Sequence, residues 1–331
     1  MKQFNNSITI SAPGKLMLLG EHVVVYDRPC IVTAVNQRMK ATVKLLNEPI
    51  FQLEAPDIQV ENYQKPMSKL GKGNIPKGAK FVEIAVTNFL IRHPERLAKD
   101  LGVKVTTSSE FSSQFGFGSS SASTVCTIRA LSEITGVNLD NKAIFDLAYK
   151  TVLDIQGKGS GFDVAAAIFG GTIYYVTLGK VIEPLRINTL PLLVGYSGIK
   201  ADTVTLVNQV AKKAKTDPEM IEDICDNIGK LVEQAKQALL SKDWQSLGRL
   251  MNSNQKLLKT LGVSTEKLNN MISAAVSAGA YGAKLSGAGG GDCMIALVPE
   301  DKTQTVKNGI TSAGGQVIDI EANAEGVTVE G

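Results

Sequence analysis

The stretch "EFSSQFGFGSSSAS", residues 110–123, places glycines and serines directly before an apolar run. A flexible linker and a phosphate-binding loop are the two interpretations. A linker gives no reason for a helix to follow at once, yet Val125, Ile128 and Leu131 share one face at helical spacing. A phosphate-binding loop explains why a helix follows, because glycines let the backbone approach an anion and the free N–H groups of the first helical turn face it. No Gly-Lys-Ser/Thr ends the stretch, so it is not a Walker A loop. Taken alone, it predicts either an anion site or a capped turn.

Two further glycine loops and one aspartate loop accompany it. They read "APGK" at residues 12–15, "GSGFD" at 159–163 and "SGAGGGD" at 286–292. Each follows or precedes a segment with the pattern of a strand or a helix, so none resembles a linker between domains. Any one of them is also typical of a plain turn. The set as a whole favours a site for a phosphorylated ligand.

The set resembles the three motifs of the GHMP kinase superfamily. "APGKLMLLGEHVVVYDRP" (12–29) is similar to the first motif, "FGFGSSSAS" (115–123) to the second and "KLSGAGGGDCMIAL" (284–297) to the third, in the family's order and over nearly the whole chain. The resemblance implies an α+β fold of two domains, one like domain 2 of ribosomal protein S5 and one ferredoxin-like, with ATP between them. The pattern of expected strands and helices changes around Pro184 and Pro191. We therefore expect domains at 1–186 and 187–331, with the boundary near Ile187.

The resemblance also implies residue roles. Lys15 matches the family lysine that neutralises the transferring phosphoryl group, and Asp163 matches the aspartate assigned as general base or as the group that orients the acceptor hydroxyl. From the residues alone, Lys15 could be a solvated lysine after a turn, and Asp163 could be the N-cap of a helix. The remaining expected ATP contacts are Gly116, Gly118, Ser119, Ser120, Ser121, Gly287 and Gly289.

The cofactors implied are ATP and Mg²⁺, with Ser120 matching the serine that approaches the metal. Mevalonate kinases of the superfamily carry a magnesium-binding glutamate four residues ahead of the position of Gln156, and this chain has Val152 there. Asp154 is close in sequence but falls on another helical face. We therefore expect Ser120, ATP oxygens and waters to hold the ion.

The acceptor is harder to predict. "LLGEHVVVYDRPCIVTAV" and "GIKADTVTLV" resemble mevalonate kinases, whereas "QGKGSGFDVAAA", Asp292 and the missing glutamate resemble phosphomevalonate kinases. Mevalonate is our expectation and 5-phosphomevalonate the alternative, which would need cations such as Lys158 or Lys200. A sugar kinase, a diphosphomevalonate decarboxylase and a non-catalytic binding protein on this fold stay open. The expected acceptor contacts are Glu21, His22, Lys158, Lys200 and Ser286.

Composition narrows the class of protein. The 331 residues are 44% hydrophobic and 20% charged with a net charge of +3, which is typical of a soluble globular protein and does not favour a nucleic-acid or membrane partner. The opening residues lack the apolar core of a signal peptide, and the four cysteines form no CxxC pair, so we expect a cytoplasmic protein with reduced thiols. With two histidines in the chain, an ordinary zinc site is not expected. A homodimer is left open.

Periodicity gives a coarse element map. Strands are expected at "ITISAPG", "CIVTAV", "ATVKLL", "VKVTTS", "GGTIYYVTL", "LLVGYS", "CMIALV", "QVIDIEA" and "GVTVE". Helices are expected at "KFVEIAVTNFLIR", "ASTVCTIRALSEI", "NKAIFDLAYKTVLDI", three times within residues 201–261, at "TEKLNNMISAAVSAG" and at "KTQTVKNGITSA". Residues 55–79, rich in Pro, Lys and Gly, are expected to form a long surface excursion.

Overall fold

The structure is a computed structural model and describes residues 7–330. Residues 1–6, on which the expectation about a signal peptide partly rests, and residue 331 lie outside the described residues. Within the described range, no helix combines the length and apolarity needed to cross a membrane. All four cysteines are buried free thiols.

The larger of two sheets is built mainly from the first half of the chain. Its main path runs β12-β1-β2-β5-β3-β4. β6 pairs with the first residues of β2, Cys30 to Thr33, and with β7. β3 and β5 are parallel, and the other pairs are antiparallel. The strands are β1 (Ser7–Leu19), β2 (Cys30–Leu46), β3 (Ile50–Ala55), β4 (Val60–Pro66), β5 (Gly102–Ser109), β6 (Thr172–Val176), β7 (Val181–Leu185) and β12 (Thr328–Val329).

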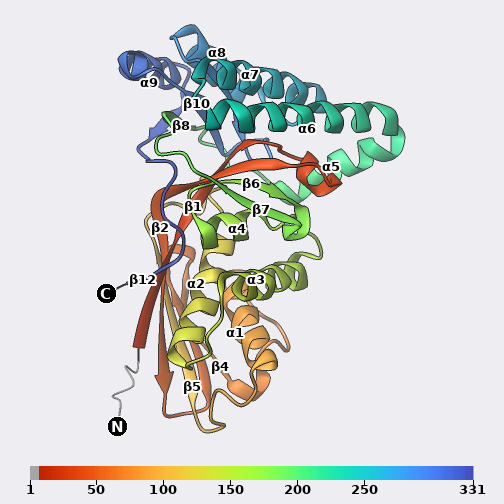
Figure 1. Ribbon diagram of the computed structural model, residues 1–331. Helices are drawn as coiled ribbons and strands as arrows, with labels where there is room; N and C mark the ends of the chain where they lie inside the picture. The colour runs from red at the N-terminus through yellow and green to blue at the C-terminus, as the bar shows by residue number, and fades with distance from the viewer. Residues whose placement is uncertain (1–6, 331) are drawn as a thin grey trace.

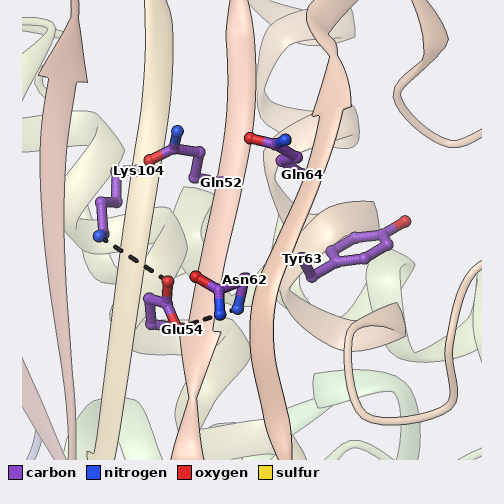
Figure 2. A pocket seen from close by; sticks show the side chains of 6 residues that line it. All are labelled: Gln52, Glu54, Asn62, Tyr63, Gln64 and Lys104. Atoms are coloured by element: carbon purple, nitrogen blue, oxygen red, sulfur yellow. Dashed lines mark hydrogen bonds and ion pairs between the residues drawn. The ribbon is translucent and has the colours of Figure 1, made fainter.

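Four helices cover one face of this sheet, as Figure 1 shows: α1 (Lys80–Arg92), α2 (Ser119–Ile134), α3 (Asn141–Gln156) and α4 (Phe162–Phe169). The strands alternate accordingly, since Phe51 and Leu53 of β3 are fully buried while their neighbours are partly exposed. The opposite face carries polar side chains. A hollow of about 210 Å³ lies there, lined by Gln52, Glu54, Asn62, Tyr63, Gln64 and Lys104. Figure 2 labels these six residues.

The second sheet is antiparallel, in the order β11-β8-β10-β9, and helices pack around it. The strands are β8 (Leu192–Tyr196), β9 (Gly282–Ser286), β10 (Cys293–Leu297) and β11 (Gln316–Ile318). The helices are α5 (Thr203–Thr216), α6 (Pro218–Leu240), α7 (Trp244–Leu261), α8 (Glu266–Ser277) and α9 (Thr303–Ser312). Aspartate or threonine side chains cap α5, α6, α7 and α8, which explains where these helices begin.

After β11 the chain returns to the first sheet (Figure 1). Ile10 of β1 pairs with Val329 of β12, and Arg38 holds the returning segment by donating to the carbonyls of Glu325 at 2.9 Å and Gly326 at 2.7 Å. The Arg38 Nε also donates to Ser11 Oγ at 2.7 Å. A single guanidinium thus satisfies acceptors in β1 and in the returning segment, which are far apart in the sequence, a role for which its fixed fork of donors is suited.

The expected α+β class is confirmed, and three details of the element map are corrected. "CIVTAV" and "ATVKLL" are one strand of 17 residues, β2, because the polar residues between them continue the pairing with β1 past a bulge. The expected excursion at 55–79 contains strand β4, whose alternation the Pro and Lys residues hid. β3 is a strand that the pattern did not indicate. The chain leaves the large sheet after Leu185 and enters the second at Leu192; the domain division at 186/187 stays a prediction.

Candidate active site

The glycine-serine loop lies at the N-terminus of α2. Gly116 (φ 73°) and Gly118 (φ 81°) both adopt the left-handed conformation, which is why glycine is needed at both positions. Gly118 is the N-cap of α2 and has no side chain to cap the helix; the first helical bond runs from the N–H of Ala122 to its carbonyl. The amides of Ser119, Ser120 and Ser121 therefore lack intrahelical acceptors, the arrangement that binds anions at helix N-termini.

Lys15 reaches this loop from β1. Its Nζ donates to the carbonyl of Gly116 at 2.7 Å and lies 5.4 Å from the centre of the Phe162 ring. The side chain is almost fully buried, and burial lowers the pKa of Lys15, an effect that the charges of Asp163 and Asp292 oppose. The alternative of a solvated lysine is therefore wrong for this structure.

Asp163 approaches the same loop from α4. A methyl group built on Gly118 would lie 3.3 Å from Cε of Lys15 and 3.7 Å from Cβ of Asp163, so lysine, loop and carboxylate converge at Gly118. The Oδ2 atom of Asp163 accepts from Ser121 Oγ at 2.6 Å. The N-cap of α4 is Gly161, not Asp163, which sits in the first turn. Asp163 is thus not the N-cap residue, but its Oδ1 accepts from the N–H of Val164 in the same turn at 3.1 Å while its Oδ2 is bonded to α2.

The "GEH" segment forms a strained turn. The N–H of Val23 donates to the carbonyl of Glu21 at 2.8 Å, and His22 between them has φ 64° and ψ −38°. This is a γ-turn of the rare hand, and such backbone strain costs about 1–3 kcal/mol and is found mainly at functional sites. The His22 Nε2–H donates to the carbonyl of Ala288 at 2.8 Å, and burial lowers the pKa of His22.

Glu21 is fully buried and is held by two residues that the sequence interpretation missed. Its carboxylate forms an ion pair with Lys284 of β9, and its Oε2 accepts from Asn254 of α7 at 3.0 Å. Both oxygens are thereby engaged. The one available signal was the lysine that opens "KLSGAGGGD"; nothing marked Asn254 in the pattern of α7.

The third motif joins the two sheets. Ser286, at the end of β9, accepts from the N–H of Met17 at 3.0 Å and donates to the Met17 carbonyl at 3.1 Å, so its hydroxyl is committed to β1. Gly287 (φ 96°) faces open space, and its expected contact with ATP stays a prediction. Gly289 packs instead against the backbone of Val263, where any side chain would collide.

Asp292 brings the third motif against the phosphate loop. A methyl group on Gly116 would collide with its carboxylate. Its Oδ1 accepts from the N–H of Ala201 at 2.9 Å and lies 4.0 Å from Lys200 Nζ, and burial raises the pKa of the Asp292 carboxyl. The site therefore has a carboxylate beside the loop that the sequence interpretation did not place there.

Lys158 and Lys200, the two lysines expected to contact the acceptor substrate, both donate hydrogen bonds within the protein. The exposed Lys158 donates to Asn208 Oδ1 of α5, so it links the aspartate loop to the second sheet's helices. Lys200 is half exposed and donates to the carbonyl of Ser113 at 2.5 Å, in the segment before the phosphate loop.

A magnesium ion has limited protein ligands here. Within residues 7–330, no three His, Cys, Asp or Glu side chains are arranged to hold a metal. Val152 is buried, and Asp154 pairs with Lys150 and with Asn88 Nδ2 at 2.8 Å, away from the loop. Ser120, in the first turn of α2, supplies an oxygen of the kind Mg²⁺ takes. The residues present therefore fit an ion carried largely by phosphate oxygens and water, which is the usual state of Mg²⁺ at nucleotide sites.

Two family models match the chain. The N-terminal domain of GHMP kinases matches residues 81–171, and the C-terminal domain of GHMP kinases matches residues 235–316.

Individual relatives agree with the family models. A protein of Pyrococcus furiosus named mevalonate kinase is 38% identical over 334 residues, covering 98% of this chain and 98% of its own. The crystal structure of Methanococcus jannaschii mevalonate kinase superposes with a TM-score of 0.82 at 27% identity, covering 96% and 98%. The structure of mevalonate kinase from L. major in complex with R-mevalonate superposes with a TM-score of 0.77 at 26% identity, covering 95% of each chain.

Proposed function

This chain belongs to the GHMP kinase family, and from that premise we propose that it is an ATP-dependent kinase that phosphorylates the C5 hydroxyl of mevalonate. One observation of this structure carries the proposal. Lys15, the left-handed Gly118 at the start of α2, and Asp163 converge on one point, which places a cation, an anion-binding helix terminus and a carboxylate within reach of one phosphoryl group. Relatives named mevalonate kinase, 35–38% identical over nearly the full chain, support the choice of acceptor.

The proposed reaction assigns each group one task. The free amides of α2 and the hydroxyls of Ser119 and Ser120 bind the ATP phosphates, while Lys15 offsets the negative charge of the transferring group. Asp163 orients the acceptor hydroxyl and takes its proton as the hydroxyl oxygen attacks the γ-phosphorus. The bond between that phosphorus and the β–γ bridging oxygen breaks, and ADP leaves.

Magnesium, when bound to the nucleotide, supplies further charge neutralisation on the phosphates. Ser120 is the proposed protein ligand, since it lies in the first turn of α2, next to the glycine-serine loop. We also propose Gly287 as a residue that borders the nucleotide, because it faces open space.

The environment of Lys158 and Lys200 favours mevalonate over 5-phosphomevalonate. A phosphorylated acceptor would require cations beyond Lys15, yet Lys158 is held by Asn208, and Lys200 is held by Ser113 and lies near Asp292. The carboxylate of Asp292 also reduces the positive charge available at this edge of the site.

The test is ATP turnover with each acceptor. The purified protein is mixed with ATP and Mg²⁺ and with mevalonate or 5-phosphomevalonate, ADP release is followed by a coupled assay, and the product is identified by ³¹P NMR. We expect a phosphomonoester from mevalonate. A diphosphate formed from 5-phosphomevalonate, with no product from mevalonate, would reject mevalonate as the acceptor but leave the assignment as a kinase in place.

The cellular compartment and the oligomeric state of the enzyme are also proposals. Four free, buried thiols fit a reducing compartment, so we propose that the protein acts in the cytoplasm. A homodimer stays a prediction, and light scattering on the eluted protein would test it.

A further inference from the structure

An ion pair lies between the two domains directly behind the "GEH" turn. The side chains of Glu21 and Lys284 are both fully buried, and Asn254, also fully buried, completes the carboxylate's partners. Each oxygen of Glu21 thus already has a partner within the protein, and its expected contact with the acceptor stays a prediction. The Oδ1 of Asn254 has no partner, so the amide is oriented by Glu21 alone.

The pair is attached to strained backbone. Glu21 supplies the carbonyl that closes the γ-turn, and His22 at its centre is fixed on the other side by Ala288. Lys284 and Ala288 belong to the same segment of the third motif, four residues apart, and Ser286 between them is fastened to Met17. The position of His22 is thus set by contacts to the second sheet on both sides.

Stability alone gives a weak reason for such a pair. The cost of removing two charges from water is about as large as their attraction, and an apolar pair of the same size commonly serves as well or better. What an ion pair adds is direction, because the ammonium group fixes one orientation of the carboxylate.

We propose that Lys284 is a positioning residue for the acceptor: by holding Glu21, it fixes the γ-turn that presents His22 to mevalonate. This inference rests on the proposed function. It predicts that loss of Lys284, whose side chain is fully buried, acts on the acceptor and not on the nucleotide.

The kinetic test compares Lys284→Met with the double variant Glu21→Gln/Lys284→Met. We expect Lys284→Met to lower kcat/KM for mevalonate by about 10–100-fold, the effect of misplacing a contact group, while KM for ATP stays within about twofold. The double variant buries no unpaired charge, so its melting temperature should recover while its acceptor kinetics stay impaired. Recovery of both would show that the pair only compensates charge, and would overturn the proposal.

Two matched controls separate positioning from general damage. Lys65→Met breaks another pair with a fully buried partner, since Lys65 Nζ lies 2.7 Å from Glu83 in the first domain. Lys236→Met breaks another interdomain pair, between α6 and β7, where Lys236 Nζ lies 2.6 Å from Glu183. Both should leave KM for mevalonate within about twofold. A fall in kcat/KM for mevalonate in either control as large as that in Lys284→Met would overturn the assignment to Lys284.

A readout without turnover tests the same idea. The chain has two histidines, His22 and His93, so its imidazole Cε1–H NMR resonances are few, and His22→Asn assigns them. Lys284→Met should move the His22 resonance and leave that of His93; Lys65→Met should leave the His22 resonance in place. If wild type fails to phosphorylate mevalonate, the proposed function fails, and this measurement still decides whether Lys284 positions His22. An unmoved His22 resonance would reject the inference.

Discussion

The Oδ2 atom of Asp163 accepts a hydrogen bond from the Oγ of Ser121 at 2.6 Å, so the first turns of α4 and α2 meet at one carboxylate. Ser121 also belongs to the turn whose free amides form the proposed phosphate site. The candidate base and the nucleotide loop are therefore parts of one rigid unit, with the hydroxyl fixing the orientation of the carboxylate.

Asp163→Asn should fold as wild type and lose most of its turnover. Removing a positioned base costs about 10²–10⁴-fold in rate. Ser121→Ala, which leaves the carboxylate but removes its orienting donor, should lose much less. Steady-state kcat and the melting temperature of both variants decide this. A fall in kcat of less than about tenfold in Asp163→Asn would remove Asp163 from the proton-transfer role.

Gly118→Ala and Gly136→Ala form a matched pair at the two ends of α2. Both glycines have positive φ, so each alanine should cost roughly 1–2 kcal/mol of unfolding free energy, measured in urea. At Gly136 the added methyl meets open space, but at Gly118 it lies 3.3 Å from Lys15. Calorimetry should show ATP affinity weakened about tenfold in Gly118→Ala alone, a loss of about 1.4 kcal/mol. Equal affinities in the two variants would contradict the phosphate-loop assignment.

Lys158→Ala should change kcat/KM for mevalonate by no more than about threefold, since an exposed lysine bound to one amide adds little. If the acceptor were 5-phosphomevalonate, the same change would cost about 1.5–3 kcal/mol, the value of a hydrogen bond to a charged group. Asn208→Ala serves as the control, because it frees the lysine without removing its charge.

The pH dependence of stability should carry a signature of His22. Burial lowers its pKa below the ordinary 6.5, so the unfolded chain binds a proton that the folded chain resists. The free energy of unfolding should therefore fall as pH drops through 6.5, by about 1.36 kcal/mol per unit of pKa difference, and level off below the folded pKa. Burial raises the pKa of Asp292, so this carboxyl has the opposite effect: its contribution to the free energy of unfolding increases as pH drops.

His22→Asn isolates this contribution, since Asn tolerates positive φ and does not titrate. Asp292 is common to both proteins, so its effect cancels in the comparison. Urea unfolding at pH 7.5 and 5.5 should show a smaller decrease in the variant; an unchanged decrease would mean that His22 is not the group responsible.

The sequence predicted those parts of the site that depend on local backbone. Gly118 and the serines after it are contiguous, and their chemistry follows from being at a helix start. Lys15 and Asp163 lie far apart in sequence, and no spacing rule brings them to Gly118; the family resemblance supplied that pairing, and the structure gives its geometry.

The contacts of the "GEH" turn could not be predicted from the sequence, for a different reason. Asn254 lies on α7 in an amphipathic pattern where a buried polar side chain is indistinguishable from an ordinary polar position. The ion pair of Glu21 with Lys284 joins residues 263 apart. β2 was divided for a similar reason, because Asn36 to Arg38 look like a turn until the bulge with β1 and the bonds to the returning C-terminal segment are seen.

The return of β12 to β1 also affects how the protein is made. Ser11 and Thr328 are hydrogen-bonded side chains 317 residues apart. Domains generally fold as units from the N-terminus during synthesis, and contacts of high sequence separation form slowly. On the ribosome, the first sheet can assemble β1 to β7 from the first 185 residues, but its outer edge beside β1 stays unpaired until Thr328 and Val329 of β12 have been synthesised. During that interval the nascent chain displays an open strand edge, the kind of surface on which chaperones and neighbouring nascent chains act.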